Sequence, residues 1–570
     1  MAEDEGRSGQ GESATPPVEV DGETLTPRDV ERVARNVAAV TVTDDAMERV
    51  RIARDRVVDV VESGEAVYGV NTGFGELVDE RIATDELERL QHNLLRSHAS
   101  GAGAELDREA VRAMLVTRLN ALVKGHSGVR PVVVEYLEAM LNAGIHPVVR
   151  SRGSLGASGD LAPLAQMALV LIGEGHADVV DGDADAMVAE AQADVMTGET
   201  SDLDARSEDD TPATRRLTGE KALATVGLEP LSLAPKEGLA LINGTQLTVG
   251  LAALLVVDAE RLVDAADAAG ALTTEVTMSS TVPAHRILNE VRPHPGHRES
   301  AARIRELTAA SAIVESHRNC DRVQDAYSLR CLPQVHGAVR EAVSHLREAV
   351  EIELNSATDN PLVFDAADAD PRASGTDRAA VLSGGNFHGE PLAMRLDYLT
   401  NALTEVAAIS ERRIDRMVNP NLQESHLPPF LTTESGVQSG YMIAQYTAAS
   451  LVNENRSLGR PSIDNTPVSG GQEDHVSMSA QSAIHARTAL GNARHVLATE
   501  LCTAAEAAEY VPDDLAHGVG TTAVYELVRE RVAPLTTDRP LTDDVETIAA
   551  VIASGTLHRR IEATIEDRSN

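Results

Sequence analysis

The segment Gly153–Pro163, which reads GSLGASGDLAP, has unusual potential for chemistry. Its residues carry little side-chain bulk, so the backbone can approach itself closely there. In a tight bend the amide nitrogen of Gly159 could attack the carbonyl carbon of Ala157. Loss of one water would close a five-membered ring, and loss of the Ser158 hydroxyl as a second water would leave an exocyclic methylidene group. The segment could therefore become an electrophile made of backbone atoms.

A structural interpretation of the same residues is also open. A glycine-rich turn would lead into a helix that begins near Leu161, with Asp160 as its N-cap and Pro163 in its first turn. Both interpretations place a helix directly behind the segment. Its N-terminal end would stabilise the negative charge that develops when a nucleophile adds to an electrophile.

Other blocks of the sequence favour the chemical interpretation. ASGDLAPLAQMAL resembles the signature of the histidine and phenylalanine ammonia-lyases, which carry 4-methylidene-imidazol-5-one, the ring described above, made autocatalytically from Ala-Ser-Gly. The resemblance implies this cofactor at Ala157, Ser158 and Gly159, with no metal and no nucleotide. It covers most of the chain, in blocks at Tyr68–Gly75, Arg96–Gly101, Lys236–Gln246, Val323–Cys331, Ser383–Pro391, Glu411–Met417 and Gly471–Met478.

Two blocks distinguish members of this family by substrate. His98 in RSHASG resembles the arrangement of the histidine-specific members, and Glu473 in GQEDHVSM stands where phenylalanine and tyrosine lyases typically have glutamine. An imidazole can hydrogen-bond both side chains, whereas phenylalanine would leave both unpaired in a buried site. The resemblance therefore implies L-histidine as the substrate, with trans-urocanate and ammonia as products. Two alternatives stay open: an aromatic amino acid lyase or aminomutase with the same ring, and a helical scaffold with an uncyclised triplet.

The resemblance also implies roles for individual side chains. Tyr68 matches the base that removes the β-proton, and Glu473 is a second candidate that the sequence does not separate from it. Arg330 is expected to bind the substrate carboxylate through its planar guanidinium. The other expected substrate contacts are His98, Asn243, Gln324, Tyr327 and Phe387. The family resemblance further implies a homotetramer whose sites are shared between subunits.

Three features need separate interpretation. Gly470 and Gly471 stand where the family pattern predicts Ala-Asn, and residues 178–216 form an acidic insertion without a counterpart, which we expect to be a surface loop. His294 and His297 do not favour a metal site, because prolines prevent a shared helical face and no carboxylate partner is evident. No phosphate-loop motif is present.

Long helices must position these residues. Apolar residues recur in steps of three and four in two segments, at Leu87, Leu90 and Leu94 and at Leu392, Leu396, Leu399, Leu403 and Val406. Strand patterns of comparable length are missing. We predict an all-α fold with a long central bundle. The family resemblance implies that this bundle is of the fumarase and aspartase type. The parts of the chain would be a disordered acidic tail at 1–25, a mostly helical N-terminal domain at 26–245 and a helical-bundle domain at 246–570.

The formal charge of −39 comes from 89 acidic and 50 basic residues, which makes nucleic acid an unfavourable partner. An acidic tail, an acidic interaction surface or adaptation to molar salt could explain this charge. The acids are spread along the whole chain and lysines are scarce, which favours salt adaptation. Three cysteines without a C-x-x-C pair, and the lack of a signal-like or membrane-length apolar segment, predict a cytoplasmic protein that binds no membrane.

Overall fold

The computed structural model describes residues 16–64, 67, 69, 72, 86–180, 214–318, 322–370, 373–463 and 465–569. The chain divides into two compact units. Unit 1 comprises Met1–Gly153, Leu161–Gln246 and Leu354–Asn386, and unit 2 comprises Ser154–Asp160, Leu247–Glu353 and Phe387–Asn570. The all-α prediction is confirmed, since helices dominate the described residues and the sheets are small. In the part of the chain described here, no helix is both long and apolar enough to cross a membrane.

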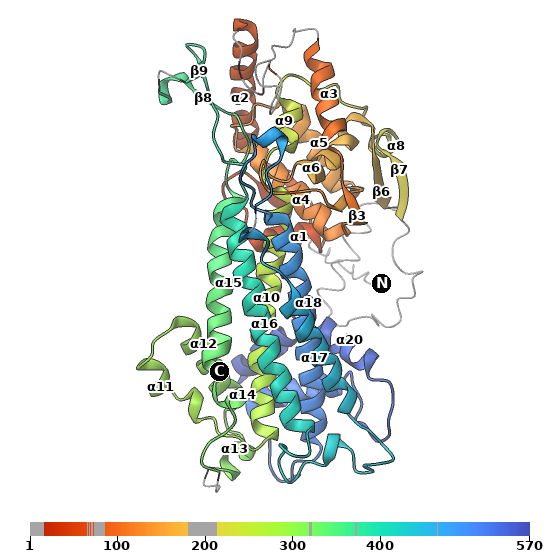
Figure 1. Ribbon diagram of the computed structural model, residues 1–570, viewed down its shortest axis with the longest axis vertical. Helices are drawn as coiled ribbons and strands as arrows, with labels where there is room; N and C mark the ends of the chain where they lie inside the picture. The colour runs from red at the N-terminus through yellow and green to blue at the C-terminus, as the bar shows by residue number, and fades with distance from the viewer. Residues whose placement is uncertain are drawn as a thin grey trace, which may run out of the picture. The chain divides into compact units, whose positions relative to one another are not determined.

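Unit 1 combines helices with short strands (Figure 1). Its helices are α1 (Pro27–Ala34), α2 (Asp44–Ser63), α3 (Leu87–His98), α4 (Arg108–Val123), α5 (Pro131–Asn142), α6 (Leu161–Leu169), α8 (Gly219–Ala224) and α9 (Glu237–Ile242). β1 (Val18–Val20) pairs in parallel with β2 (Val40–Val42), and β3 (Ala102–Glu105) pairs antiparallel with β5 (Arg150–Arg152). β6 (His176–Val180) lies between β4 (Ile145–Pro147) and β7 (Thr214–Thr218), and β10 (Ala379–Leu382) lies between β8 (Leu362–Asp365) and β9 (Ser374–Gly375).

Two expectations about unit 1 need correction. Residues 16–25, which we expected in a disordered tail, include β1, where Val18 and Val20 are buried and Glu19 is exposed. This alternation is typical of a half-buried strand, although the polar residues around it suggested disorder. The ends of the acidic insertion, 178–180 and 214–216, are not loop as expected but belong to β6 and β7, which pair antiparallel from His176↔Thr218 to Val180↔Thr214. Residues 181–213 lie outside the described residues.

Helix α4 forms the centre of unit 1. Every residue from Ala110 to Val123 is buried, including the two arginines of this stretch, so the helix has no solvated face. The guanidinium of Arg112 donates to the carbonyl oxygens of Val33 (2.7 Å) and Leu141 (2.9 Å). Buried charge is tolerated here because backbone oxygens accept the donors.

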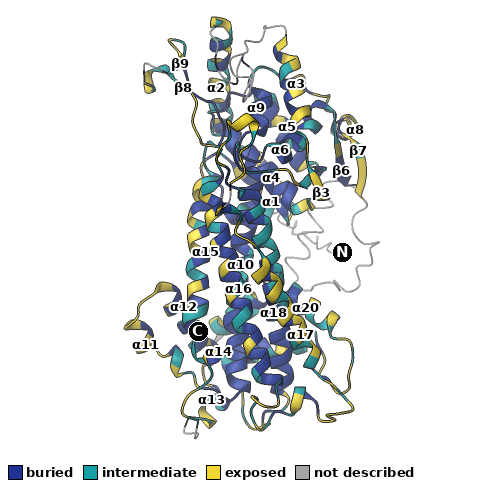
Figure 2. Cartoon of the chain, in the orientation of Figure 1, coloured by how far each residue is buried: buried dark blue, intermediate teal, exposed yellow. Residues whose placement is uncertain are grey.

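Unit 2 is built on long helices (Figure 1). Its helices are α10 (Gln246–Val276), α11 (Arg286–Glu290), α12 (Pro295–Leu307), α13 (Ala312–Ser316), α14 (Tyr327–Arg330), α15 (Leu332–Leu354), α16 (Glu390–Val418), α17 (Met442–Ser457), α18 (Ser479–Ala508), α19 (Val519–Arg529), α20 (Thr542–Ala553) and α21 (Thr556–Ser569). α16 begins with a proline in its first turn and buries the five apolar residues on which its prediction depended. Figure 2 shows the buried stretches along α10, α16 and α18.

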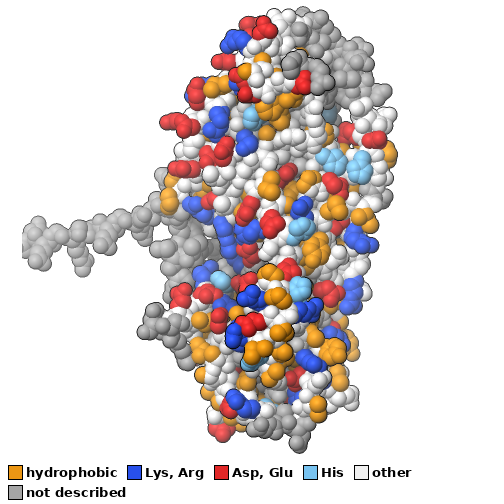
Figure 3. Space-filling model, turned by 90° about the vertical axis from the view of Figure 1, so that its left-hand side faces the viewer, with side chains coloured by type: hydrophobic (Ala, Val, Ile, Leu, Met, Phe, Trp, Pro, Cys, Tyr) orange, Lys and Arg blue, Asp and Glu red, His pale blue; other side chains and the backbone are white. Residues whose placement is uncertain are grey.

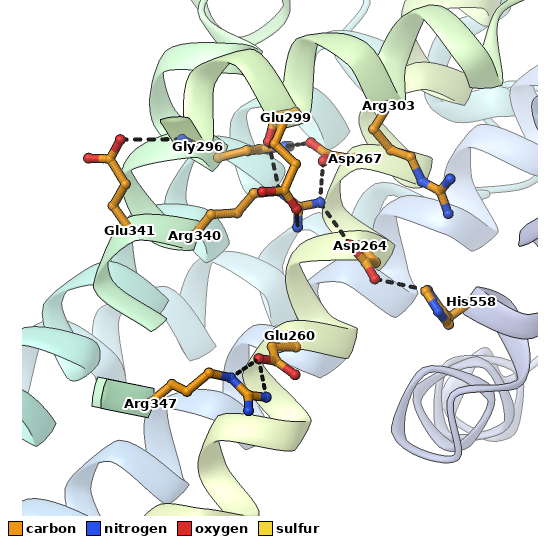
Figure 4. A network of polar contacts seen from close by, with 12 residues as sticks. Glu260, Asp264, Asp267, Gly296, Glu299, Arg303, Arg340, Glu341, Arg347 and His558 are labelled. Carbon is orange, nitrogen blue, oxygen red and sulfur yellow. Dashed lines mark hydrogen bonds and ion pairs between the residues drawn. The ribbon is translucent and has the colours of Figure 1, made fainter. Parts of the chain in front are cut away.

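Ion pairs connect the long helices of unit 2. Arg340 of α15 binds Asp264 (2.8 Å) and Asp267 (2.7 Å) of α10 and Glu299 (2.9 Å) of α12, as Figure 4 shows. A fully buried pair joins α16 to α18, where Arg413 Nε lies 2.5 Å from Glu500 Oε1 and Arg413 Nη2 lies 2.7 Å from Oε2. Such bidentate pairing makes the contact between the two helices geometrically specific.

Candidate active site

The structure places the predicted site residues in both units. Tyr68 lies outside the described residues, and His98 and Asn243 belong to unit 1. Unit 2 holds Ala157, Ser158, Gly159, Gln324, Tyr327, Arg330, Phe387 and Glu473. We call residues 157–159 the triplet and residues 154–160 the triplet segment. Hydrogen bonds join this segment to the starts of α10, α16 and α18.

The backbone immediately before the triplet is held by two helix starts. The carbonyl oxygen of Gly156 accepts from the backbone N–H of Gly389 (3.0 Å), the N-cap of α16, and from Ser477 Oγ (3.0 Å). The carbonyl oxygen of Leu155 accepts from the backbone N–H of Met478 (2.7 Å), the N-cap of α18. N–H groups at helix starts carry partial positive charge, so this surrounding favours negative charge that develops nearby.

Asp160 holds the backbone immediately after the triplet. Its carboxylate accepts from Ser154 Oγ (2.7 Å) and from both the N–H (2.8 Å) and the Oγ1 (3.1 Å) of Thr248, in the first turn of α10. We expected Asp160 to be the N-cap of the helix that follows it, α6. Its carboxylate instead accepts from a backbone N–H in the first turn of α10. Complete burial raises the pKa of Asp160, against the hydrogen bonds that lower it.

Close packing explains why side-chain-poor residues are needed here. Gly156 has φ +69°, and a Cβ on it would lie 2.2 Å from Ser477 Oγ and 2.5 Å from Ser479 Oγ. A Cβ on Gly389 would likewise lie 2.2 Å from Ser479 Oγ. Gly159 also has positive φ, +75°. Only glycine allows the starts of α16 and α18 to approach the triplet segment this closely.

The triplet itself fits the ring that the sequence predicts. Ala157 is 4% exposed and Gly159 is buried, whereas Ser158 is half-buried. The atoms that would close the ring are therefore shielded, while the residue that would carry the methylidene group remains partly accessible. The described residues contain no set of three or more His, Cys, Asp or Glu arranged to hold a metal ion.

Gln324, Tyr327 and Arg330 lie together on and before α14. The guanidinium of Arg330 donates to Gln324 Oε1, and the side chain of Tyr327 is 74% exposed. Sequence reasoning missed two residues that support this group. Arg322 Nη1 lies 2.9 Å from Asp325 Oδ1, and Asp325 accepts from the N–H of Ser280 (2.8 Å) just beyond α10. Only Asp325 falls within a matched block, and Ser280, which donates to it, is 45 residues away in sequence.

The turn before Glu473 explains why Gly470 and Gly471 stand where the family pattern predicts Ala-Asn. Val468 and Glu473 form an antiparallel bridge, closed by a turn in which Ser469, Gly470 and Gly471 have φ of +54°, +65° and +94°. Glycine adopts positive φ without steric cost, so the two glycines suit this turn. Glu473 itself is half-buried.

Asn465 and two histidines stabilise the chain beyond Glu473. Asn465 Nδ2 donates to the carbonyl oxygen of Asp474 (2.6 Å), and its Oδ1 accepts from the N–H of Val476 (3.0 Å). The rings of His388 and His475 are stacked with centroids 5.7 Å apart. His388 directly follows Phe387, so this stack connects the Phe387 and Glu473 segments within unit 2.

In unit 1, buried polar groups position Asn243. Arg118, fully buried in α4, donates through Nη2 to the carbonyl oxygens of Ala240 (2.6 Å) and Asn243 (2.7 Å) at the end of α9. These bonds satisfy carbonyls that the helix leaves without partners. His98 ends α3, and its Nδ1 lies 2.9 Å from the carbonyl oxygen of Leu94 and 3.0 Å from Ser97 Oγ.

The structure adds one carboxylate near the histidine pair of RPHPGH. The rings of His294 and His297 lie 4.5 Å apart, and Glu341 Oε1 is 3.9 Å from His294 Nδ1. Glu341 is 47 residues from His294, so the local sequence around RPHPGH does not reveal this partner. These distances describe a loose polar cluster at the start of α12.

Comparisons with known proteins agree with this geometry. The pattern of the family described as aromatic amino acid lyase matches residues 25–530. A probable histidine ammonia-lyase of Halobacterium salinarum is 56% identical over 96% of this chain and 98% of its own. Solved structures of tyrosine aminomutase from Streptomyces globisporus (TM-score 0.84, 36% identity, 96% and 99% of the two chains) and histidine ammonia-lyase from Trypanosoma cruzi (TM-score 0.81, 36% identity, 96% of each chain) share its fold. The chain belongs to the aromatic amino acid lyase family.

Proposed function

We propose that this protein is a histidine ammonia-lyase, which converts L-histidine to trans-urocanate and ammonia without oxidation. The observation that carries the substrate assignment is Glu473, a half-buried carboxylate on the segment that also contacts the triplet segment. Relatives named histidine ammonia-lyase, 56% and 45% identical over at least 95% of this chain, support the same assignment.

The cofactor in this proposal is 4-methylidene-imidazol-5-one, formed from Ala157, Ser158 and Gly159. It would supply an electrophilic carbon that binds the substrate amine and makes it a better leaving group. The hydrogen bonds at Gly156 and Asp160 support this assignment, because they restrain the backbone at both ends of the triplet. The N–H groups at the starts of α10, α16 and α18 would stabilise negative charge there.

The other side chains would bind the substrate and move its proton. Glu473 and His98 can hydrogen-bond the two imidazole nitrogens, and a carboxylate favours the protonated ring. Arg330, already oriented by Gln324, can bind the substrate carboxylate through two parallel N–H groups. Tyr68 or Glu473 would remove the β-proton. Asn243, Tyr327 and Phe387 complete the proposed contacts.

We include a homotetramer with shared active sites in the proposal. The 74% exposure of Tyr327, an expected substrate contact, is consistent with a site completed by another subunit. Exposed apolar side chains on α16 and α17 also favour association, at Met394 (59%), Tyr398 (47%), Ile443 (55%) and Tyr446 (63%).

A salt-rich cytoplasm is the proposed location. The net charge of −39 and the three lysines of the chain suit a protein whose charge repulsion is screened by salt. On the face shown in Figure 3, hydrophobic side chains lie between charged ones of both signs. Cys331 and Cys502 are free thiols, as expected in a reducing compartment.

The variant Ser158→Ala tests the cofactor and the activity together. Alanine has no hydroxyl to eliminate, so the wild-type chain should be lighter than its sequence mass by two waters and the variant should not. In molar salt the wild type should release urocanate from L-histidine, and the variant should lose nearly all turnover. Retention of a tenth of the wild-type rate would contradict the ring mechanism. Preferential release of cinnamate from phenylalanine would instead identify an aromatic amino acid lyase.

A further inference from the structure

Three residues at the start of α18, Ser477, Met478 and Ser479, contact the triplet segment or its partners, and we call them the serine clamp. Ser477 and Ser479 are 0% exposed. Ser477 Oγ donates to the carbonyl oxygen of Gly156 (3.0 Å) and accepts from the N–H of Ser479 (3.3 Å). The hydroxyl of Ser477 is therefore held in place by the helix start that it links to the triplet segment.

A chain of hydroxyl groups links the clamp to Asp160, the residue that follows the triplet. Ser479 Oγ lies 3.0 Å from Thr248 Oγ1, which lies 3.1 Å from Asp160 Oδ1. Thr248 has one hydroxyl proton, so if it donates this to the carboxylate, Ser479 must be the donor in the other contact. Ser154 completes the connection, since its Oγ donates to Asp160 Oδ1 (2.7 Å) and accepts from the N–H of Gly156 (3.2 Å).

These contacts form a closed hydrogen-bonded circuit that includes both residues flanking the triplet. Gly156 and Asp160 are thus linked to each other through side chains as well as through the intervening backbone. Ordering one residue's backbone costs about 1–2 kcal/mol, so a short segment on its own would sample many conformations in which ring closure is impossible. The circuit restricts the segment before any covalent step.

We propose that the serine clamp positions the triplet for ring closure, with Ser477 as its main positioning residue. This inference rests on the proposed function, because it concerns formation of the proposed cofactor. In closure, Gly159 N bonds to the carbonyl carbon of Ala157, whose oxygen leaves as water with the amide protons of Ser158 and Gly159. A second water takes the Ser158 hydroxyl and its Cα proton. Ser477 takes no part in these bonds and acts by fixing the Gly156 carbonyl.

Ser477→Ala tests the clamp, with Ser482→Ala as the matched control. Ser482 is also a fully buried serine of α18, but its Oγ has no hydrogen-bond partner among the residues that the structure describes. The two variants and the wild type would be refolded in molar salt, and intact masses recorded over time would give the fraction of chains that have lost two waters. One buried hydrogen bond corresponds to roughly five- to tenfold slower closure in Ser477→Ala. Ser482→Ala should close at the wild-type rate.

Gly389→Ala provides a second, independent perturbation of the clamp. It keeps the N–H that Gly389 donates, and its φ of −77° suits alanine, but the new Cβ would lie 2.2 Å from Ser479 Oγ and displace the clamp. We expect slower closure in this variant too, and it carries the test alone if Ser477→Ala does not fold by circular dichroism.

The outcomes separate the clamp from the proposed function. If Ser477→Ala folds and its ring closes as fast as that of Ser482→Ala, the clamp proposal is wrong. If Ser477→Ala does not fold, ring closure in Gly389→Ala at the wild-type rate would overturn the proposal. A wild-type chain that keeps its full sequence mass would overturn the proposed function itself.

Discussion

His146 should make the stability of unit 1 depend on pH. Its side chain lies in β4 and is 5% exposed, with Nε2 3.2 Å from Arg112 Nη1. Burial, and then the positive charge of Arg112, lower the pKa of His146 from its ordinary value of 6.5 to about 3. Folded His146 therefore stays neutral and accepts a hydrogen bond from Arg112, whereas the same histidine in the unfolded chain becomes protonated in mild acid.

The sign and size of the effect follow from proton linkage. Because the folded pKa lies below the unfolded pKa, the unfolded chain binds more protons in acid, and stability falls as the pH decreases from 6.5 toward 3. At pH 5 the unfolded histidine is almost fully protonated, and the loss relative to pH 7 is about 2 kcal/mol at about 1.4 kcal/mol per pH unit.

His146→Gln is the matched variant, because glutamine does not titrate and its amide oxygen can still accept from Arg112. Urea unfolding of both chains at pH 7 and pH 5, in the same molar salt, gives the change in the free energy of unfolding with pH. Other groups titrate equally in both chains, so the wild type should lose about 2 kcal/mol more than the variant. Equal pH dependence in the two chains would refute a buried neutral imidazole.

Four further outcomes can be measured. Glu473→Gln should reduce histidine turnover by at least about two orders of magnitude, through loss of a charged contact or of a base, and near-normal turnover would contradict that role. Arg413→Met should cost about 3–5 kcal/mol in urea unfolding by leaving the Glu500 carboxylate buried without its partner, whereas an unchanged free energy of unfolding would contradict the buried pair. Refolding Ser158→Ala together with Arg330→Ala should restore partial activity, and no complementation would argue for self-contained sites. Activity and assembly should be lost together below a few tenths molar salt. Repulsion between the acidic subunits is then less screened, because the Debye length grows from about 3 Å at 1 M to about 30 Å at 0.01 M. Light scattering that shows a full-sized, active tetramer in dilute buffer would argue against salt adaptation.

Local sequence patterns predict individual helices, such as α3, α6 and α16, and the residue types that could do chemistry. The spacing that predicts α16 is local, because residues three and four apart share one helical face and are buried together. Likewise, the small side chains of the triplet segment are read directly from consecutive residues. They indicate close approach of the backbone even though the residues that pack against it are not known from the sequence. Local information failed at β1, where three residues form a strand only through pairing with Val40–Val42.

The surroundings of the triplet depend on contacts between residues that are far apart in the sequence. Asp160 bonds to Thr248, 88 residues away, and Ser477 bonds to Gly156 across 321 residues. Asp160, Thr248 and Ser477 are all present in the sequence, but no local pattern pairs residues at such separations. The same holds for Arg118 and Asn243, whose contact depends on how α4 packs beside the end of α9. Such long-range contacts depend on how whole helices pack, so they can be identified only from the folded structure.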